Sequence, residues 1–209
     1  MTTERATHWD NAYANGDTTR SWYQPSPTTS LRLLEEAAVS PAVGLIDVGG
    51  GASTLVDALL VRGHIDLTVL DVSAHGLDLA RDRLRSRADS VTWIVTDLLS
   101  WVPTRRYAVW HDRAVFHFLT DPVETGRYRS VLSEALEPGG LAIVGAFATD
   151  GPTHCSGLEV ARYDGPTLAE QVAPRWDVVT ELREEHHTPS GGVQPFTWVV
   201  LRRPVGHAE

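Results

Sequence analysis

The chain has 209 residues, 42% of them hydrophobic, which predicts one domain with a full hydrophobic core. Acidic residues outnumber basic ones by 27 to 18, and the formal net charge of −9 argues against a basic face that binds bare nucleic acid. The single cysteine, Cys155, excludes an internal disulfide, and the lack of a leader or a long apolar span predicts a cytoplasmic protein with no membrane partner. All 18 basic residues are arginine, a usage typical of GC-rich bacterial genomes.

The first 29 residues carry more aromatic surface than an ordinary tail. Trp9, Tyr13, Trp22 and Tyr23 stand there among polar residues. Another surface must cover these rings. Two alternatives are open, namely simple packing onto the edge of a sheet and covering of a bound ligand.

A strand, a glycine turn, a helix and a second strand come next. After a helix predicted at residues 30–39, Leu45 to Val48 predicts a strand, and the glycines that follow allow a sharp turn and a close approach of the backbone to a ligand. Residues 53–62 predict a helix that the Ser53 hydroxyl caps. Residues 67–71 predict a strand that ends in a carboxylate. This order is typical of a nucleotide-binding βαβ unit.

Three kinds of nucleotide site compete for this turn. A phosphate-binding P-loop needs a lysine, and the chain has none, so that class is excluded. A dinucleotide site wants a glycine or alanine where Thr54 stands, and Asp47 would repel a pyrophosphate. A carboxylate at residue 47 suits a cationic ligand. S-adenosylmethionine carries a sulfonium and an ammonium and no phosphate.

The rest of the chain alternates helix and strand. A helix with a buried stripe of Leu77, Ala80 and Leu84 is predicted from Ala74 to about Arg87. Further strands are predicted at 91–96, 107–111, 141–147, 177–184 and 196–201, and further helices from Asp121 to a stop at Pro138-Gly139-Gly140 and at 167–172. The last two strands are joined by a Pro-Ser-Gly-Gly turn and predict an antiparallel pair.

Four ordered motifs carry a family resemblance. They are Asp47-x-Gly49-x-Gly51, Asp71, Asp97 and the run Leu136-Glu-Pro-Gly-Gly140. Over about residues 9 to 202 the chain resembles the class I S-adenosylmethionine-dependent methyltransferases, although Ser53 stands where many members have a third glycine. The resemblance implies an α/β, Rossmann-like fold with a seven-stranded, mostly parallel sheet, helices on both faces and an antiparallel C-terminal strand pair. It implies a single domain, 1–209, in which residues 1–29 cover cofactor and substrate and 30–209 form the core.

The same resemblance implies a set of cofactor-binding residues at the carboxyl ends of the strands, where open α/β sheets bind ligands. Asp47 would hold the methionine ammonium, Asp71 the ribose, and Asp97 with Leu98 the adenine; Asp97 has the alternative role of a helix cap. The full predicted set is Trp22, Asp47, Gly49, Gly50, Gly51, Asp71, Val72, Asp97, Leu98 and Asp112.

The junction after the strand at 107–111 is where an acceptor should meet the sulfonium. An Asp112-Arg113 pair leaving a buried strand is costly to desolvate unless each group is bonded. We expect His117 or Asp112 to be the catalytic residue that removes a proton, if the acceptor needs one removed, with His154 and Tyr163 behind them. Equally, His117 is a polar wall or a packed residue of a helical turn.

Two further features are interpreted as structural. Cys155 has no clustered partners, and methyl transfer from a sulfonium needs neither a nucleophile nor a metal, so no metal site is predicted. His186 and His187 are adjacent in an extended strand and point to opposite faces, so they predict a solvated hairpin tip and not a ligand pair.

The predicted function is transfer of a methyl group from S-adenosylmethionine to an unidentified acceptor, a small molecule in preference to a protein, with release of S-adenosylhomocysteine. A protein-lysine methyltransferase and a cofactor-binding protein without transferase activity stay open, and a hydride-transfer enzyme is the weakest alternative. Oligomeric state is not determined by the sequence.

Overall fold

The computed structural model describes residues 2–14, 16 and 18–206. The chain divides into two compact units, which we describe separately: unit 1 comprises residues 1–101 and 187–193, and unit 2 comprises residues 102–186 and 194–209. The expectation of a single domain therefore stays a prediction.

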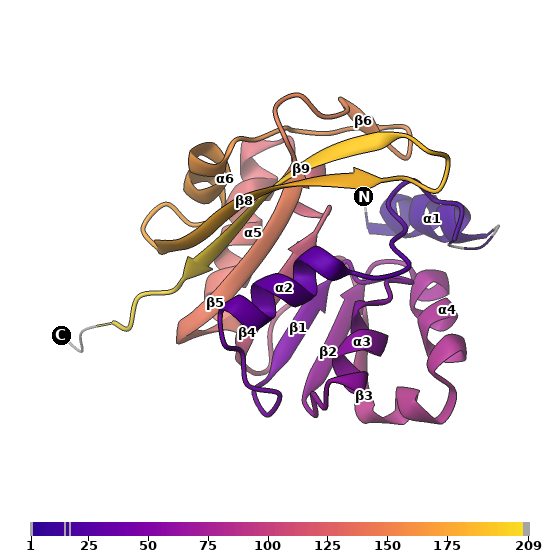
Figure 1. Ribbon diagram of the computed structural model, residues 1–209, viewed down its shortest axis with the longest axis horizontal. Helices are drawn as coiled ribbons and strands as arrows, with labels where there is room; N and C mark the ends of the chain where they lie inside the picture. The colour runs from indigo at the N-terminus through magenta and orange to yellow at the C-terminus, as the bar shows by residue number, and fades with distance from the viewer. Residues whose placement is uncertain (1, 15, 17, 207–209) are drawn as a thin grey trace. The chain divides into compact units, whose positions relative to one another are not determined.

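Unit 1 contains the predicted βαβ unit and one further parallel strand. Strands β1 (Leu45–Val48), β2 (Leu67–Asp71) and β3 (Val91–Val95) pair in parallel, with Leu45 opposite Leu67 and Leu67 opposite Val91. The helices are α1 (Thr2–Tyr13), α2 (Thr28–Glu36), α3 (Leu55–Val61) and α4 (Ala74–Leu84), with a 3-10 turn η1 at Arg85–Ser90 (Figure 1). Every residue of β1 and β2 is buried, as parallel strands covered on both faces are.

Local capping explains where the helices of unit 1 begin. The Ser53 hydroxyl accepts a hydrogen bond from the amide of Leu55, the first residue of α3, at 3.1 Å, although the N-cap position itself is Thr54, which makes no side-chain cap bond. The Ser73 hydroxyl accepts one from the Gly76 amide at 2.9 Å at the start of α4. The predicted stripe of α4, Leu77, Ala80 and Leu84, is buried.

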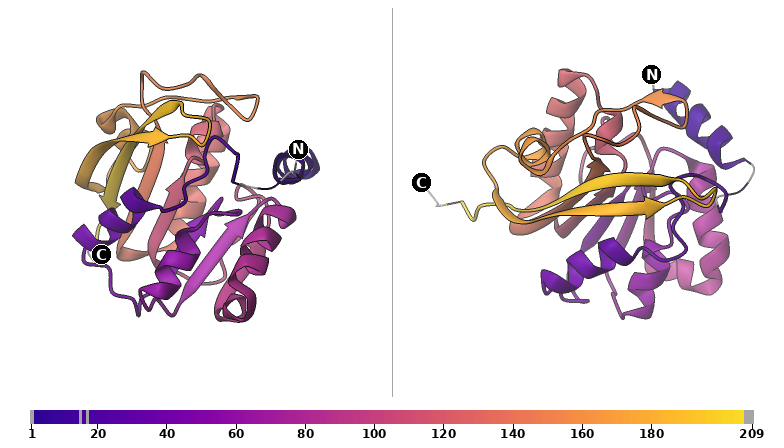
Figure 2. Two further views of the ribbon diagram at one scale, coloured as in Figure 1. Left: turned by 45° about the vertical axis from the view of Figure 1, so that its right-hand side comes forward. Right: turned by 45° about the horizontal axis from the view of Figure 1, so that its top comes forward.

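Unit 2 is built on two parallel strands, β4 (Tyr107–Arg113) and β5 (Leu136–Phe147), with Arg113 opposite Gly145. Strand β9 (Val193–Arg202) pairs with β5 in the antiparallel direction, and β8 (Asp177–His187) lies beside β9 (Figure 2). The other elements are η2 (Phe116–Phe118), α5 (Pro122–Ala135), α6 (Gly165–Val172) and a hairpin of β6 (His154–Cys155) and β7 (Leu158–Glu159).

The strand order of the sheet is β3-β2-β1-β4-β5-β9-β8, seven strands that are parallel except for the C-terminal pair. The predicted fold class, a Rossmann-like α/β sheet closed by an antiparallel strand pair, is confirmed. Among the described residues, no helix is long and apolar enough to cross a membrane. The cytoplasmic location and bacterial origin stay predictions.

Several boundaries differ from those predicted. The aromatic N-terminal segment contains a helix, α1, that was not predicted. The helix that begins at Pro122 ends at Ala135, and residues 136–140 join β5, because Leu136 pairs with Tyr107 and the Gly139 amide donates to the Arg203 carbonyl. Strand β8 runs on to His187, so His186 is buried and its interpretation as a solvated hairpin tip is wrong; His187 is exposed, as opposite-facing neighbours should be.

The core of unit 2 contains a chain of three buried polar side chains. The Trp110 indole N–H donates to the Tyr128 hydroxyl at 2.9 Å, and that hydroxyl donates to Asp112 Oδ2 at 2.7 Å. All three side chains have essentially no solvent exposure. A buried chain of this kind stabilises the fold only while every member keeps its partner.

We expect Tyr128→Phe to lower the free energy of unfolding by about 3 kcal/mol, because it leaves both the Trp110 N–H and Asp112 Oδ2 without their partner. Urea unfolding followed by tryptophan fluorescence measures the loss. The control is Tyr107→Phe, at a buried tyrosine of the same unit whose ring packs under the Arg105 guanidinium. Equal, small losses in both variants would show that the chain of hydrogen bonds does not stabilise unit 2.

Candidate functional site

The candidate site of unit 1 is built on the glycine turn after β1. Gly49 and Gly51 have φ values of 64° and 43°, in the left-handed region that favours glycine. The amides of Gly49 and Gly50 both donate to the Leu70 carbonyl, at 2.7 and 3.2 Å, which holds the turn against β2. A Cβ on Gly50 would lie 2.7 Å from Asp47 Oδ2, so the carboxylate lies directly against the turn.

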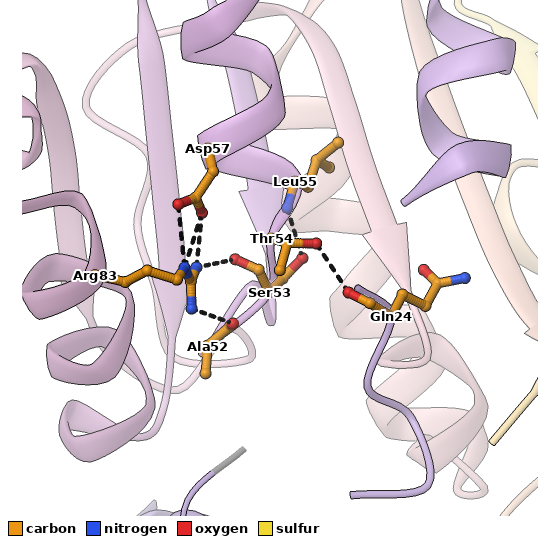
Figure 3. A network of polar contacts seen from close by, with 7 residues as sticks. All are labelled: Gln24, Ala52, Ser53, Thr54, Leu55, Asp57 and Arg83. Atoms are coloured by element: carbon orange, nitrogen blue, oxygen red, sulfur yellow. Dashed lines mark hydrogen bonds and ion pairs between the residues drawn. The ribbon is translucent and has the colours of Figure 1, made fainter. Parts of the chain in front are cut away.

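A clamp from α4 fixes the exit of this turn (Figure 3). The Arg83 guanidinium donates to the carbonyls of Ala52 and Ser53, at 3.0 and 2.7 Å, and pairs with Asp57 of α3 at 2.7 Å. The Thr54 hydroxyl donates to the Gln24 carbonyl at 3.0 Å. Arg83 was not predicted as a site residue, because its partners stand 26 to 31 residues away in sequence.

Three buried carboxylates end the three strands of unit 1. Asp47, Asp71 and Asp97 are 4%, 7% and 7% exposed, within two residues of the carboxyl ends of β1, β2 and β3. Asp71 Oδ1 accepts a hydrogen bond from the Ser73 amide at 2.7 Å, and Oδ2 lies 3.2 Å from where a Cβ of Gly51 would be. The structure therefore brings together Asp47, the glycine turn and Asp71.

Burial raises the pKa of Asp71 to about 7. The nearby charge of Asp47 raises it further, while hydrogen bonds from the amides of Ser73, Gly51 and Val72 lower it. The Val72 amide therefore donates a hydrogen bond to the carboxylate that the sequence assigns to the ribose. A carboxyl group poised near neutral pH at a ligand-binding edge is a functional-site candidate.

Of the two roles that the sequence left open for Asp97, the structure shows the cap, and the contact with adenine stays a prediction. Its Oδ1 accepts a hydrogen bond from the Leu99 amide at 2.9 Å, so it caps the turn that contains the buried Leu98. Its Oδ2 lies 3.4 Å from the Arg5 guanidinium of α1. The capping oxygen and the outward oxygen are different atoms, so capping does not occupy the whole carboxylate.

Helix α1 packs against the same group of residues through one face. Asp10 Oδ1 accepts hydrogen bonds from the Ser73 hydroxyl at 2.6 Å and from the His75 amide at 3.1 Å, at the start of α4. The Tyr13 hydroxyl lies directly on Gly51, and its ring lies on Gly76. The i, i+3 spacing of Asp10 and Tyr13 would place them on one helical face, and this was the sequence signal that could have identified them.

Trp22 belongs to an aromatic cluster with α1. Its ring makes edge contacts with Trp9 and Tyr13, with centroid distances of 5.8 and 6.1 Å. These contacts join Trp22 to the rings of α1, and both alternatives for the segment, packing onto the sheet edge and covering of a ligand, stay predictions. Through Tyr13, the cluster reaches the glycine turn.

The predicted catalytic residues belong to unit 2. Asp112 is fully buried: Oδ2 accepts from Tyr128, and Oδ1 accepts from the amides of Val115 and Phe116, at 3.0 and 3.4 Å. Burial raises its pKa to about 6, against the lowering effect of the Tyr128 hydrogen bond. These bonds favour a structural role, in which the carboxylate holds the turn that follows β4.

His117 is also fully buried, in η2. Its Nδ1 accepts a hydrogen bond from the Phe147 amide at 3.3 Å. Burial, with the nearby Arg113 charge, lowers its pKa to about 3, so the imidazole is neutral at physiological pH. Among the described residues, no group of three or more histidine, cysteine, aspartate or glutamate side chains is arranged to hold a metal ion.

Comparison with solved structures identifies the fold. The chain aligns over 97% of its length, at a TM-score of 0.72 and 18% identity, with 94% of an S-adenosylmethionine-dependent methyltransferase from Anabaena variabilis. The fold is that of the class I methyltransferases. A second similar structure is the N-methyltransferase NodS from Bradyrhizobium japonicum, crystallised with S-adenosylhomocysteine. It aligns at a TM-score of 0.70 and 17% identity, over 95% of this chain and 99% of its own.

A third structure, from work on the conversion of a disulfide bond into a thioacetal group during echinomycin biosynthesis, aligns at a TM-score of 0.76 and 16% identity over 97% of this chain and 93% of its own. No protein-family model matches the sequence, and no curated protein matches it.

Because burial raises the pKa of Asp71 in the folded chain, the folded state holds its proton to higher pH than the unfolded state does. The stability that this group contributes is complete below the unfolded-state pKa near 4 and is lost as the pH rises through about 7. At pH 8 we expect Asp71→Asn to have a higher free energy of unfolding than the wild type, by up to a few kcal/mol, measured by urea unfolding. At pH 4 the two free energies should differ little. The same difference in free energy of unfolding at both pH values would contradict a raised pKa for Asp71 in the folded chain.

Proposed function

We propose that the chain is an S-adenosylmethionine-dependent methyltransferase that acts on a small-molecule acceptor. The observation that carries this proposal is the pair of buried carboxylates, Asp47 and Asp71, against a glycine turn in a chain without lysine. Such a site repels phosphate and favours a cationic nucleoside with free ribose hydroxyls. The shared fold with NodS, crystallised with S-adenosylhomocysteine, supports the choice of cofactor.

Each cofactor-binding residue has a proposed task. Asp71 accepts hydrogen bonds from the ribose hydroxyls, Asp47 holds the ammonium, and the backbone of Gly49, Gly50 and Gly51 lies under the ligand. Asp97 Oδ2 and Leu98 receive the adenine. The glycine turn suits this use, since a Cβ on Gly51 would meet Asp71 Oδ2 at 3.2 Å as well as Tyr13.

Methyl transfer would depend mostly on alignment of the acceptor with the sulfonium and on exclusion of water, because the methyl group is already activated. A protein base is optional. His117 is neutral and has its Nδ1 engaged by Phe147, so we assign it to the polar wall of the acceptor site. Asp112 as a base or cofactor ligand stays a prediction, which its three hydrogen bonds do not favour.

Calorimetric titration with S-adenosylhomocysteine tests the proposal. We expect micromolar or tighter binding by the wild type and at least a tenfold loss in Asp71→Ala, because two charge-assisted hydrogen bonds to the ribose are removed. The control is Asp78→Asn, at an exposed carboxylate of α4 that pairs with Arg81, and it should bind like the wild type. No binding by the wild type, or binding of NAD instead, would refute the proposal.

Transfer itself is tested with methyl-labelled S-adenosylmethionine and a cell extract separated by ultrafiltration. Label in the small-molecule fraction supports the proposed acceptor class. Label only in the protein fraction would favour the lysine methyltransferase alternative, and cofactor binding without transfer in either fraction would favour a binding protein.

Helix α1 is proposed to close over the bound cofactor, with Asp10 as its anchor on α4. Asp10→Ala removes that anchor, and we expect S-adenosylhomocysteine to dissociate roughly tenfold faster, since about 1–2 kcal/mol of capping interaction is lost. Stopped-flow fluorescence of the nearby Trp9 and Trp22 measures the rate. The matched control, Asn11→Ala, changes the next, exposed residue of the same helix. Unchanged dissociation in Asp10→Ala would show that α1 does not hold the cofactor.

A further inference from the structure

Strand β3, in unit 1, has one unpaired side. It stands first in the strand order of the sheet, so it pairs with β2 on one side only. The Thr96 amide donates to the Asp71 carbonyl at 2.9 Å, and the alternation of a parallel ladder therefore turns the backbone groups of the even-numbered residues of β3 toward β2. The backbone groups of the odd-numbered residues, Trp93 and Val95 among them, face outward.

The sequence of β3 does not block this edge. An exposed strand edge pairs with another strand unless charges, prolines or bulges prevent it. The five residues of β3 are Val-Thr-Trp-Ile-Val, with no charge and no proline, and they pair with β2 without a register shift. The last of them, Val95, is 49% exposed. The edge of β3 is therefore open to a further strand.

A groove of about 560 Å³ lies beside this edge. Val91 and Trp93 line it from β3, and Arg81 lines it from α4. The Arg81 guanidinium lies 5.2 Å from the centre of the Trp93 ring, and the indole N–H donates to the Ala88 carbonyl at 3.0 Å, so the ring is held in place. Because alternate side chains share one face of a strand, Val95 points to the same side of the sheet as Val91 and Trp93.

A second copy of the chain fits this edge about its central residue. Two β3 strands paired antiparallel about a two-fold axis at Trp93 exchange both backbone hydrogen bonds between their Trp93 residues. The Val95 amide of each copy then faces the Val91 carbonyl of the other. The Val91 amide needs no new acceptor, because it already donates to the Ala88 carbonyl. In this register each exposed Val95 side chain lies beside Val91 of the other copy, at the groove.

The charges along the groove also suit a second copy. Asp82, Arg85 and Asp89 line it and are exposed, and within the described part of the chain their side chains have no hydrogen-bond or ion-pair partner. A surface with free charges of both signs is complementary to itself across a two-fold axis, where the two α4 helices run antiparallel. A nucleic acid would instead be repelled by the two aspartates.

We propose that β3 is the interface of a homodimer, in which two copies form an antiparallel β3–β3 pair centred on Trp93. The inference rests on unit 1 alone and is independent of the proposed methyltransferase function. Since a five-residue strand supplies few hydrogen bonds and a small contact area, the dissociation constant is expected in the micromolar range.

Sedimentation velocity of the full chain from roughly 1 to 200 µM tests the dimer. The mass should rise from 22.9 kDa toward twice that value. We expect Val95→Lys to weaken dimerisation at least tenfold, because an ammonium replaces an apolar side chain beside a groove that Arg81 and Arg85 line. The control is Val61→Lys, the same change at an exposed valine of α3, which should dimerise like the wild type.

A monomer at every concentration, or equal dimerisation constants for Val95→Lys and Val61→Lys, would overturn the proposal. Hydrogen exchange of the wild type needs no variant. As the concentration rises, the amides of Trp93 and Val95 should exchange more slowly, while those of Thr92 and Ile94, already bonded to β2, should not change. A dimer without added protection at Trp93 and Val95 would show that the interface lies elsewhere.

Cross-linking tests the register. Thr92 of one copy and Ile94 of the other would be directly opposite, in a pair without backbone hydrogen bonds, where the strands approach most closely. On oxidation, Thr92→Cys mixed with Ile94→Cys should give a disulfide-linked dimer, and neither variant alone should do so. A cross-link in Thr92→Cys alone, or none in the mixture of variants that thermal unfolding shows to be folded, would contradict pairing centred on Trp93.

Discussion

The burial of Asp71 beside Asp47 is the constraint on which the rest of unit 1 depends. Two carboxylates against one glycine turn repel each other, and burial raises the pKa of Asp71 to about 7. A site of this kind is unfavourable for the free chain, and it is retained at the expense of stability. It becomes favourable when a ligand supplies a positive charge and hydrogen-bond donors. The Arg83 clamp holds the backbone at the exit of this turn.

Two buried polar side chains of unit 2 differ in how completely they are hydrogen-bonded. Asp112 is surrounded by donors from Tyr128, Val115 and Phe116, and it holds the backbone after β4 in place. His117, five residues later, has one nitrogen satisfied by Phe147 and the other without a partner among the described residues. A satisfied group indicates a structural role, and a buried, unsatisfied one points to a ligand. This contrast favours a scaffold role for Asp112.

The sequence predicted the features that depend on residues close together in the chain. The strand at 67–71, the buried stripe of α4 and the carboxylates near the carboxyl ends of three strands follow from periodicity and spacing, and the structure contains them. Helix α1 was missed because its contacts, from Asp10 to Ser73 and from Arg5 to Asp97, join residues 63 and 92 positions apart. Arg83 was missed for the same reason. The Pro138-Gly139-Gly140 run predicted a stop, yet pairing of its neighbours with Tyr107 and Arg203 extends β5 through it.

The proton balance of cofactor binding tests the central claim most directly. If ribose hydroxyls donate to Asp71, they favour its ionised form, and a carboxyl group with a pKa of about 7 must then lose its proton on binding. Titrating S-adenosylhomocysteine at pH 7 in buffers of different ionisation enthalpy should show release of roughly half a proton per site, which Asp71→Asn abolishes. Binding with no proton release, or with the same release in Asp71→Asn, would contradict the assignment of Asp71 to the ribose.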